Sequence, residues 1–408
     1  MRAYERFLKY VKVHTTSDPA NVGCLPSSER QFDLARMLVK EMEAMGIQDA
    51  RMDEQCYVYG SLPATAGCED APALGFIAHM DTSPDSSGEG VKPILHHNYD
   101  GKDVRLPNDR IIDVKTFPRL GDLKGQTLIT ASGDTLLGGD DKAGIAEILT
   151  ACERLIQENI PHGKLCIGFT PDEEIGAGAA GFDVPTFGAK YAYTVDGGEA
   201  GEIEYETFNA AGAKVTFYGT SVHPGSAKNI MVNANKMAME FSAMLPQEEC
   251  PEKTEGREGF YHLCNMSGSV EKSVLEYIIR DHDRKIFEER KAKMEEAVQE
   301  IRKCYRKDSV ELSIEDSYYN MAKVIEENFH LVENAREAIR EAGLNPITIP
   351  VRGGTDGSRL SYMGLPCPNL GTGGFYCHGP NECVTVEGMD KATEIVLNII
   401  KLYAREKA

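Results

Sequence analysis

The chain has 408 residues, 41% of them hydrophobic, which is too long for one ordinary core and predicts two domains. Its 64 acidic and 44 basic side chains give a net charge of −20, a field that would repel a phosphate polymer and argues against nucleic-acid binding. Eleven cysteines without a CxxC pair indicate reduced thiols and argue against a disulfide framework or zinc knuckle.

The N-terminal segment "MRAYERFLKYVKVHTTSD" predicts an amphipathic helix and lacks the apolar run of a signal peptide. A second amphipathic helix is expected at 27–46, capped by Ser27 or Ser28 and ended by Gly46. No segment approaches the roughly 20 apolar residues that a membrane span needs. We therefore expect a cytoplasmic protein that does not enter a membrane.

Strands and helices then alternate along the chain. The segment "ALGFIAH" predicts a short buried strand, and residues 91–130 are loop-rich and resemble a β-hairpin excursion. A helix is expected at 141–159, and "KLCIGFTPDEE" and "KYAYTVDGGE" begin as strands. Strands separated by helices indicate an α/β fold, with a mostly parallel sheet covered by helices on both faces.

The pattern changes at residues 209–317. Here the expected order is β-α-β-β-α-β, which is that of a ferredoxin-like α+β sandwich. The α/β pattern then returns, with a helix at 326–344, a strand within "PITIPVRGGTDGS" and a closing helix at 387–407. We therefore expect a main domain of residues 1–208 and 318–408, with residues 209–317 inserted as a second domain.

Histidine and acidic residues stand where several predicted strands end. In an open α/β sheet these carboxyl ends line the functional crevice. The positions are His79 and Asp81 in "AHMDTSP", Asp140 in "LLGGDDKAGIA", Glu173 and Glu174 in "FTPDEEIG", Asp196 in "TVDGGE" and His378 in "GGFYCHGPNE". Two imidazoles and several carboxylates are therefore expected together at one edge of the sheet.

Each of these positions except His378 also has an ordinary structural explanation. His79 and Asp81 could be a surface pair at a turn, and Asp140 could be a helix N-cap. The two glutamates could begin a solvated acidic helix, and Asp196 could be a turn residue beside two glycines. Their occurrence together on separate strand ends favours a functional site over coincidence.

The donor set is typical of a pair of metal ions. Three carboxylates and two imidazoles suit two zinc-class cations that share a bridging ligand. Side chains two apart on a strand share a face, so Asp81 could hold one ring nitrogen of His79 while the other binds metal. Because adjacent residues point in different directions, one of Glu173 and Glu174 could bind metal while the other serves as general base.

The motifs as a set resemble the M20 metallopeptidases. "HMD", "GGDDKAG", "DEEIG", "VDGG", "SVHPGSAKN", "GGTDGSRL" and "CHGP" carry the resemblance, which runs from residue 1 to about residue 408. "KNIMVNA", "IIRDHD" and "PVRGGTDGSRLS" are similar to the tripeptidase branch in particular. The resemblance implies a zinc aminopeptidase-like catalytic domain with an inserted lid and dimerisation domain, and hence a homodimer.

The resemblance also implies a metal-ligand set. His79, Asp140 and Asp196 would hold one Zn²⁺, and Asp140, Glu174 and His378 would hold a second, with Co²⁺ or Mn²⁺ as alternatives. The family motif places the bridging aspartate two residues before the lysine of "DDK", which selects Asp140 over Asp141. Many members of the family have a cis peptide bond directly after this aspartate.

Catalytic and substrate-binding roles are implied in the same way. Glu173 would be the general base and acid, Asp81 would orient His79, and His223 of the inserted domain would stabilise the oxyanion. The substrate-binding positions would be Asn233 and Arg280 of the inserted domain and Arg352 of the main domain. Arg280 could bind the C-terminal carboxylate of the peptide in bidentate fashion, although an ordinary ion pair at a strand end would also explain it.

The implied activity is hydrolysis of the N-terminal peptide bond of a tripeptide, with release of the N-terminal amino acid. Other activities of the family remain alternatives: dipeptidase, carboxypeptidase or N-acyl-amino-acid deacylase. A peptide-binding protein without catalysis is a further alternative, against which the intact Glu173 argues. The expected partner is a short peptide substrate.

Overall fold

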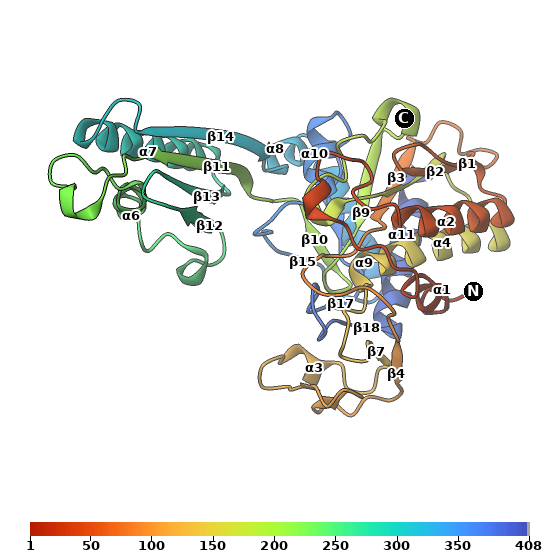
Figure 1. The fold of residues 1–408 in the computed structure, drawn as a ribbon. Helices are drawn as coiled ribbons and strands as arrows, with labels where there is room; N and C mark the ends of the chain where they lie inside the picture. Colours follow the sequence, from red (N-terminus) through yellow and green to blue (C-terminus); the bar gives the residue numbers. More distant parts are fainter. Residues whose placement is uncertain (406–408) are drawn as a thin grey trace. The chain divides into compact units, whose positions relative to one another are not determined.

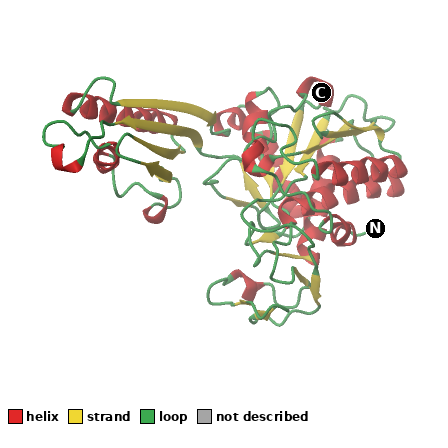
Figure 2. Cartoon of the chain, in the orientation of Figure 1, coloured by secondary structure: helices red, strands yellow, loops and turns green. Residues whose placement is uncertain are grey.

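The computed structural model describes residues 1–405, which divide into two compact units. Unit 1 consists of Met1–Tyr205, Lys323–Ile349 and the described chain from Thr355 onward, and unit 2 of Glu206–Ala322 and Pro350–Gly354. Figure 1 colours the chain along its sequence, and Figure 2 shows its helices and strands.

The assignment of residues 350–354, and with them Arg352, to the main domain is wrong. Within unit 2 the Val351 N–H donates to the Glu206 carbonyl at 2.8 Å, and the Phe208 N–H donates to the Gly353 carbonyl at 3.1 Å. These backbone bonds tie the segment to the first residues of unit 2. The predicted strand in this region is correspondingly short and covers only Ile347–Thr348.

Unit 1 is built on an eight-stranded sheet with parallel inner strands. The order is β1-β2-β8-β3-β9-β16-β10-β15, and β3 pairs in parallel with both β8 and β9. β3 and β8 are buried along their whole length, as expected of strands covered on both faces. The bounds are β1 Gln48–Met52, β2 Val58–Leu62, β3 Leu74–His79, β8 Leu165–Thr170, β9 Tyr191–Val195, β10 Glu202–Glu204, β15 Ile347–Thr348 and β16 Asn369–Leu370.

Alternating side chains of the inner strands pack against helices on opposite faces. Tyr193 donates its hydroxyl hydrogen to the Leu331 carbonyl of α9, and the Phe76 ring stacks on the Tyr193 ring. Ile77 points the other way and packs in a cluster with Phe187 of α5 and Leu360 of α10. This confirms the prediction of an α/β fold with helices on both faces.

The helices of unit 1 include the five that the sequence predicts, which begin at Ala3, Gln31, Gly139, His330 and Val386, and four short ones that it does not predict. They are α1 Ala3–Tyr10, α2 Gln31–Met45, α3 Arg119–Asp122, α4 Gly139–Glu158, α5 Val184–Phe187, α8 Ala322–Glu326, α9 His330–Glu341, α10 Asp356–Tyr362 and α11 Val386–Tyr403. The predicted closing helix extends to residue 407, and its last two residues lie outside the described chain. Among residues 1–405, no helix has both the length and the apolar composition needed to cross a membrane.

The predicted N-cap of α2 is wrong, although its end at Gly46 is confirmed. Gly46 adopts the left-handed conformation, but the N-cap position is Arg30 and no side chain caps it. Ser27 instead donates its backbone N–H and its hydroxyl hydrogen to the Asp172 carboxylate. Ser28 donates to the Thr16 carbonyl. Both serines are thus used by tertiary contacts.

The loop-rich excursion contributes to two small sheets. β4 Ile94–His96 and β7 Leu128–Thr130 join β17 Gly374–Phe375 and β18 Cys383–Thr385 in a four-stranded sheet of order β17-β18-β7-β4. The short hairpin lies at β5 Val104–Arg105 and β6 Ile111–Ile112, which pair antiparallel.

Unit 2 has the element order that the sequence predicts. β11 Asn209–Tyr218, α6 Ala234–Met244, β12 Phe260–Gly268, β13 Lys272–Asp281, α7 Arg284–Cys304 and β14 Val310–Tyr318 follow one another, and the antiparallel sheet has the order β12-β13-β11-β14. Alternate residues of the sheet, such as Phe217 and Leu275, pack with Phe241 of α6 and Met294 of α7.

The close contact between α4 and β9 can be tested at Gly144. A Cβ at this position would lie 1.9 Å from the Val195 carbonyl oxygen and 2.5 Å from Asp141 Oδ1. We expect Gly144→Ala to lower the free energy of unfolding by about 1–3 kcal/mol in chemical denaturation, because overpacking outweighs the gain in helix propensity. Gly23→Ala, which meets no atom within 4 Å, is the control. Wild-type stability of Gly144→Ala would contradict this packing.

Candidate metal centre

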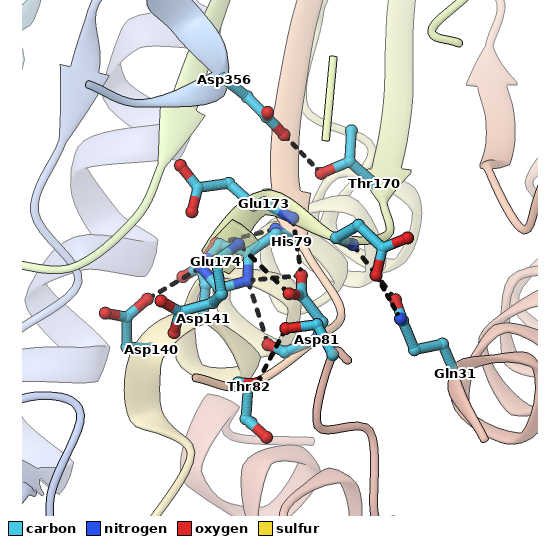
Figure 3. Close-up of polar contacts among 12 residues, drawn as sticks. Gln31, His79, Asp81, Thr82, Asp140, Asp141, Thr170, Glu173, Glu174 and Asp356 are labelled. Carbon is cyan, nitrogen blue, oxygen red and sulfur yellow. Dashed lines mark hydrogen bonds and ion pairs between the residues drawn. The ribbon is translucent and has the colours of Figure 1, made fainter. Parts of the chain in front are cut away.

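The carboxyl ends of adjacent strands bring the predicted ligands together. His79 is the last residue of β3 and pairs in register with Thr170, the last residue of β8. The loop after β8 leads into a short 3₁₀ turn, Glu173–Ile175, and Asp196 directly follows β9. Figure 3 shows the side chains around His79.

Asp140 lies between the two histidines. Its Oδ1 is 2.8 Å from His79 Nε2, and its Oδ2 is 3.2 Å from His378 Nε2. Asp140 stands at the start of α4 but has non-helical backbone angles, and the Asp140–Asp141 peptide bond is cis. One carboxylate oxygen thus faces each imidazole, which is the arrangement of a bridging ligand.

The other two carboxylates lie on either side of Asp140. Asp196 Oδ1 is 3.5 Å from His79 Nε2, and Glu174 Oε2 is 3.0 Å from His378 Nε2. Ligand atoms of His79, Asp140 and Glu174 all lie within 4.8 Å of one another. The five predicted ligands therefore lie together around Asp140.

Asp141 is also close to this cluster, and its ligand atoms could group with those of His79 and Asp196. Its oxygens, however, already accept backbone hydrogen bonds. Oδ2 accepts the His79 N–H at 3.1 Å, and Oδ1 accepts the Gly144 N–H at 3.2 Å. Asp141 therefore holds the backbone together, and Asp140 is the better candidate for a metal ligand.

Asp81 connects His79 to the turn that carries the glutamates. Its Oδ1 lies 3.3 Å from His79 Nδ1, and its backbone carbonyl lies 3.1 Å from the same nitrogen. The Asp81 carboxylate also accepts the N–H groups of Glu173 at 3.0 Å and Glu174 at 3.2 Å (Figure 3). Asp81 is thus placed to orient the imidazole, with its own carbonyl sharing this role.

The Glu173 carboxylate takes part in no hydrogen bond or ion pair with any other residue in 1–405. Burial raises its pKa well above the ordinary value, although the nearby His79 acts to lower it, and the negative charges of Asp196, Asp356 and Glu174 raise it further. A free carboxylate with a raised pKa beside the candidate ligands has the properties of a general base.

Burial and hydrogen bonds within the cluster shift the pKa values of its members. Burial raises the pKa of Glu174 to about 7 and also raises that of Asp196. Burial acts in the same direction on Asp140, but hydrogen bonds from His378 and His79 outweigh it and hold that pKa far below its usual range. Hydrogen bonds to Asp140 and Glu174 raise the pKa of His378 to about 11.

One oxygen of Glu174 tests whether the cluster suits a cation. Glu174 Oε1 is buried and has no hydrogen-bond partner among the described residues. A buried carboxylate oxygen without a partner is costly, and a cation would satisfy it. The imidazole and carboxylate donors, with this oxygen among them, are those that zinc prefers.

The remaining predicted site residues belong to unit 2. His223 is exposed, and its Nδ1 accepts the Gly225 N–H at 3.1 Å. Asn233 caps α6, where its side chain accepts the Asn235 N–H at 3.0 Å. Arg352 donates to the carbonyls of Gly256 and Glu258 and to the Thr254 hydroxyl. Arg352 thus has a structural contact, and its predicted role in substrate binding stays a prediction.

Arg280 of unit 2 is half-buried without a carboxylate partner in the described chain. Its Nη1 donates to the Ile279 carbonyl at 3.2 Å, and its guanidinium lies 5.4 Å from the centre of the Tyr318 ring. Burial lowers its pKa from the ordinary value. The ordinary ion pair at a strand end is therefore not observed for this residue.

Several carboxylates of the centre were not predicted. Asp85 Oδ2 lies 3.5 Å from His378 Nδ1, on the ring nitrogen that faces away from Asp140. Asp356 accepts the Thr170 hydroxyl hydrogen at 2.7 Å, and Glu382 accepts three backbone N–H groups of the loop before Asp141. Asp356 lies within "GGTDGSRL", one of the motifs that carry the resemblance, whereas the only sequence signal for Asp85 and Glu382 was that each follows a predicted site residue by four positions.

Comparisons with known proteins agree with the fold. Residues 138–402 match the model of Peptidase family M20/M25/M40. A Peptidase T of Alkaliphilus oremlandii is 51% identical over 405 residues, which cover 98% of this chain and 99% of the relative. Among solved structures, the aminopeptidase PepT of Bacillus cereus superposes with a TM-score of 0.78 at 25% identity, covering 99% of this chain and 98% of the other. A dinuclear metal-binding peptidase of the M20 family from Bacillus subtilis superposes with a TM-score of 0.66 at 13% identity, covering 98% and 97%.

The roles of the two adjacent aspartates can be separated by metal content. We expect Asp140→Ala to lose both cations after dialysis, because Asp140 faces both histidines, whereas Asp141→Asn still binds two cations per chain. Atomic absorption on the dialysed proteins measures this, and circular dichroism checks that both variants are folded. Loss of both cations from Asp141→Asn, with Asp140→Ala unaffected, would reverse the assignment.

Proposed function

Because the chain belongs to peptidase family M20/M25/M40, we propose that it hydrolyses the N-terminal peptide bond of tripeptides, with two divalent cations sharing Asp140. The observation that carries this proposal is the position of Asp140 between His79 and His378, with the free carboxylate of Glu173 beside them. The tripeptide specificity is supported by 51% identity to a protein called Peptidase T over nearly the whole chain.

The proposed cations are two Zn²⁺, held by His79, Asp140, Asp196, Glu174 and His378. Co²⁺ and Mn²⁺ suit the same imidazole and carboxylate donors, and the choice between them depends on cellular supply. Bound at this site, the pair would supply electrostatic stabilisation of the oxyanion and a lowered pKa for the attacking water.

Glu173 is the proposed general base. Its carboxylate is free to accept a proton from the attacking water, and its raised pKa strengthens its affinity for that proton. The same proton would then pass from Glu173 to the leaving amine. Asp81 supports this step by fixing the backbone N–H of Glu173 and holding the ring of His79.

His223 is proposed to donate a hydrogen bond to the oxyanion. Its Nδ1 accepts the Gly225 N–H, so the neutral ring carries its proton on Nε2 and can donate from there. A Cβ at Gly225 would lie 3.1 Å from His223 Nδ1, so glycine lets the backbone approach the ring. This role requires His223 Nε2 to reach the scissile carbonyl in the substrate complex.

Arg280 is proposed to bind the C-terminal carboxylate of the peptide. A half-buried guanidinium without a carboxylate partner in the described chain has the donors for a bidentate contact with a ligand. A contact at fixed reach from the scissile bond would limit the substrate to three residues. Asn233 and Arg352 are proposed as further substrate contacts.

A homodimer through unit 2 and a cytoplasmic location are also proposed. All eleven cysteines are unpaired, as expected of a reducing compartment.

The general-base proposal predicts a specific loss of rate. We expect Glu173→Ala to keep both cations and to hydrolyse a tripeptide with a kcat about 10²–10⁴-fold below wild type, which is the usual contribution of a general base.

The substrate specificity is tested on wild type with di-, tri- and tetrapeptides and an N-acetyl amino acid. A wild-type protein that prefers any of these other substrates to the tripeptide would overturn the proposed specificity.

The carboxylate contact predicts a change in length preference. Arg280→Ala should lower kcat/KM for tripeptides about 10- to 150-fold, because hydrogen bonds to charged groups contribute about 1.5–3 kcal/mol. The loss should be much smaller for a tripeptide amide, which lacks the carboxylate. Arg306→Ala, which removes an exposed arginine near Asp308, is the control. An Arg280→Ala protein that still preferred free tripeptides as strongly as wild type would contradict the contact.

A further inference from the structure

Glu382 is a buried carboxylate, 1% exposed, that lies beside the loop leading to Asp140. Its Oε2 accepts the N–H groups of Leu137 and Gly138, both at 2.8 Å, and its Oε1 accepts the Asp140 N–H at 3.0 Å. Three donors within four residues converge on one side chain, where Gly138 adopts a left-handed conformation, with φ of 83°, just before α4. Glu382 thus fixes the backbone of the proposed bridging residue itself.

The approach of Glu382 to this loop depends on Gly139. A Cβ at Gly139 would lie 2.7 Å from Val384 Cγ1 and 3.1 Å from Glu382 Oε1. The glycine therefore leaves room for the carboxylate against the loop. The contact is built into the packing of two segments that are more than 200 positions apart, since the Asp140 and Glu382 positions differ by 242.

The other end of the contact is joined to His378. Glu382 follows His378 by four positions, and its N–H donates to the Gly379 carbonyl at 3.1 Å, which closes a turn between them. The next residue, Cys383, begins β18 and pairs with Thr130 of β7. Glu382 therefore links the loop of His378 to the loop of Asp140.

The two histidines that face Asp140 are thus tied to it by different carboxylates. Asp141 accepts the His79 backbone N–H and belongs to the same helix start as Asp140. Glu382 provides the corresponding link on the side of His378. The His79 link does not involve Glu382, so the two sides of the centre are held separately.

We propose that Glu382 is a positioning residue that sets the spacing between Asp140 and His378, and thereby the affinity of the cation held by Asp140, Glu174 and His378. This rests on the proposed dinuclear function. The cation on the side of His79 and Asp196 shares Asp140 but depends on Glu382 less, because its histidine is linked to the start of α4 by Asp141. Removing a group that orients metal ligands typically costs about 10–100-fold in metal affinity or activity.

Metal titration tests the proposal without relying on turnover. Wild type, Glu382→Gln and the control Glu387→Gln would be stripped with a chelator and titrated with Zn²⁺ by calorimetry. Glu387 is a matched control because its carboxylate also accepts a backbone N–H, that of Thr127 at 2.8 Å, away from the ligands. In Glu382→Gln the side-chain amide presents an NH₂ group to a backbone N–H, so at least one of the three contacts is lost.

We expect Glu382→Gln to bind one Zn²⁺ within about threefold of wild-type affinity and the second about 10–100-fold more weakly. At Zn²⁺ concentrations that saturate wild type, its kcat for a tripeptide should fall while KM stays within about twofold, because no substrate contact is removed. Glu387→Gln should match wild type in both measurements.

Two results would overturn the proposal. One is wild-type affinity for both cations in Glu382→Gln. The other is an equal loss of affinity for both cations together with a lowered melting temperature of the metal-free protein, which would show a general structural role.

If Glu382→Gln does not fold, Glu382→Asp, which keeps the charge on a shorter side chain, is expected to show the same selective loss. A wild-type protein that binds two cations but cleaves no tripeptide would refute the proposed substrate and leave this comparison intact.

Discussion

The candidate centre depends on the placement of one carboxylate group. Asp140 has one oxygen 2.8 Å from His79 and the other 3.2 Å from His378, and these histidines come from distant parts of the chain. A carboxylate can serve two cations only if both sets of ligands are held within about 0.5 Å of the productive geometry. The backbone around Asp140 must therefore be fixed from both sides, and the surrounding structure can be understood as meeting this requirement.

The backbone around Asp140 is fixed by N–H groups that donate to buried carboxylates. Asp141 and Glu382 hold the start of α4 to the segments of His79 and His378, and Asp81 holds the turn of Glu173 and Glu174. Burial raises the pKa values of Glu174 and Asp196, and the negative charge of Asp140 raises them further. Divalent cations would offset the repulsion between these carboxylates and satisfy the partnerless Glu174 Oε1, so the cost of the arrangement is itself an argument for metal binding.

The sequence predicted the elements and the ligand-bearing positions better than the contacts between them. Hydrophobic periodicity located β3, β8, β9 and α4, and parallel strands bring their carboxyl ends together, so His79 and Asp196 could be placed at one edge. Ser27 and Ser28 looked like helix caps because local chemistry allows it, but Asp172 and Thr16 bind them through the tertiary fold. Glu382 could not be identified because its partners lie 242 to 245 positions away. Arg352 was assigned to the wrong unit because its segment pairs with the chain at Glu206.

The most direct measurement is anomalous diffraction at the zinc edge from crystals grown with Zn²⁺. We expect two peaks about 3.5–4 Å apart, with Asp140 providing one oxygen to each and with ligand distances of about 2.0–2.2 Å. His79 and Asp196 should coordinate one peak, and Glu174 and His378 the other. A single peak, or two peaks bridged by Asp141 in place of Asp140, would contradict the account.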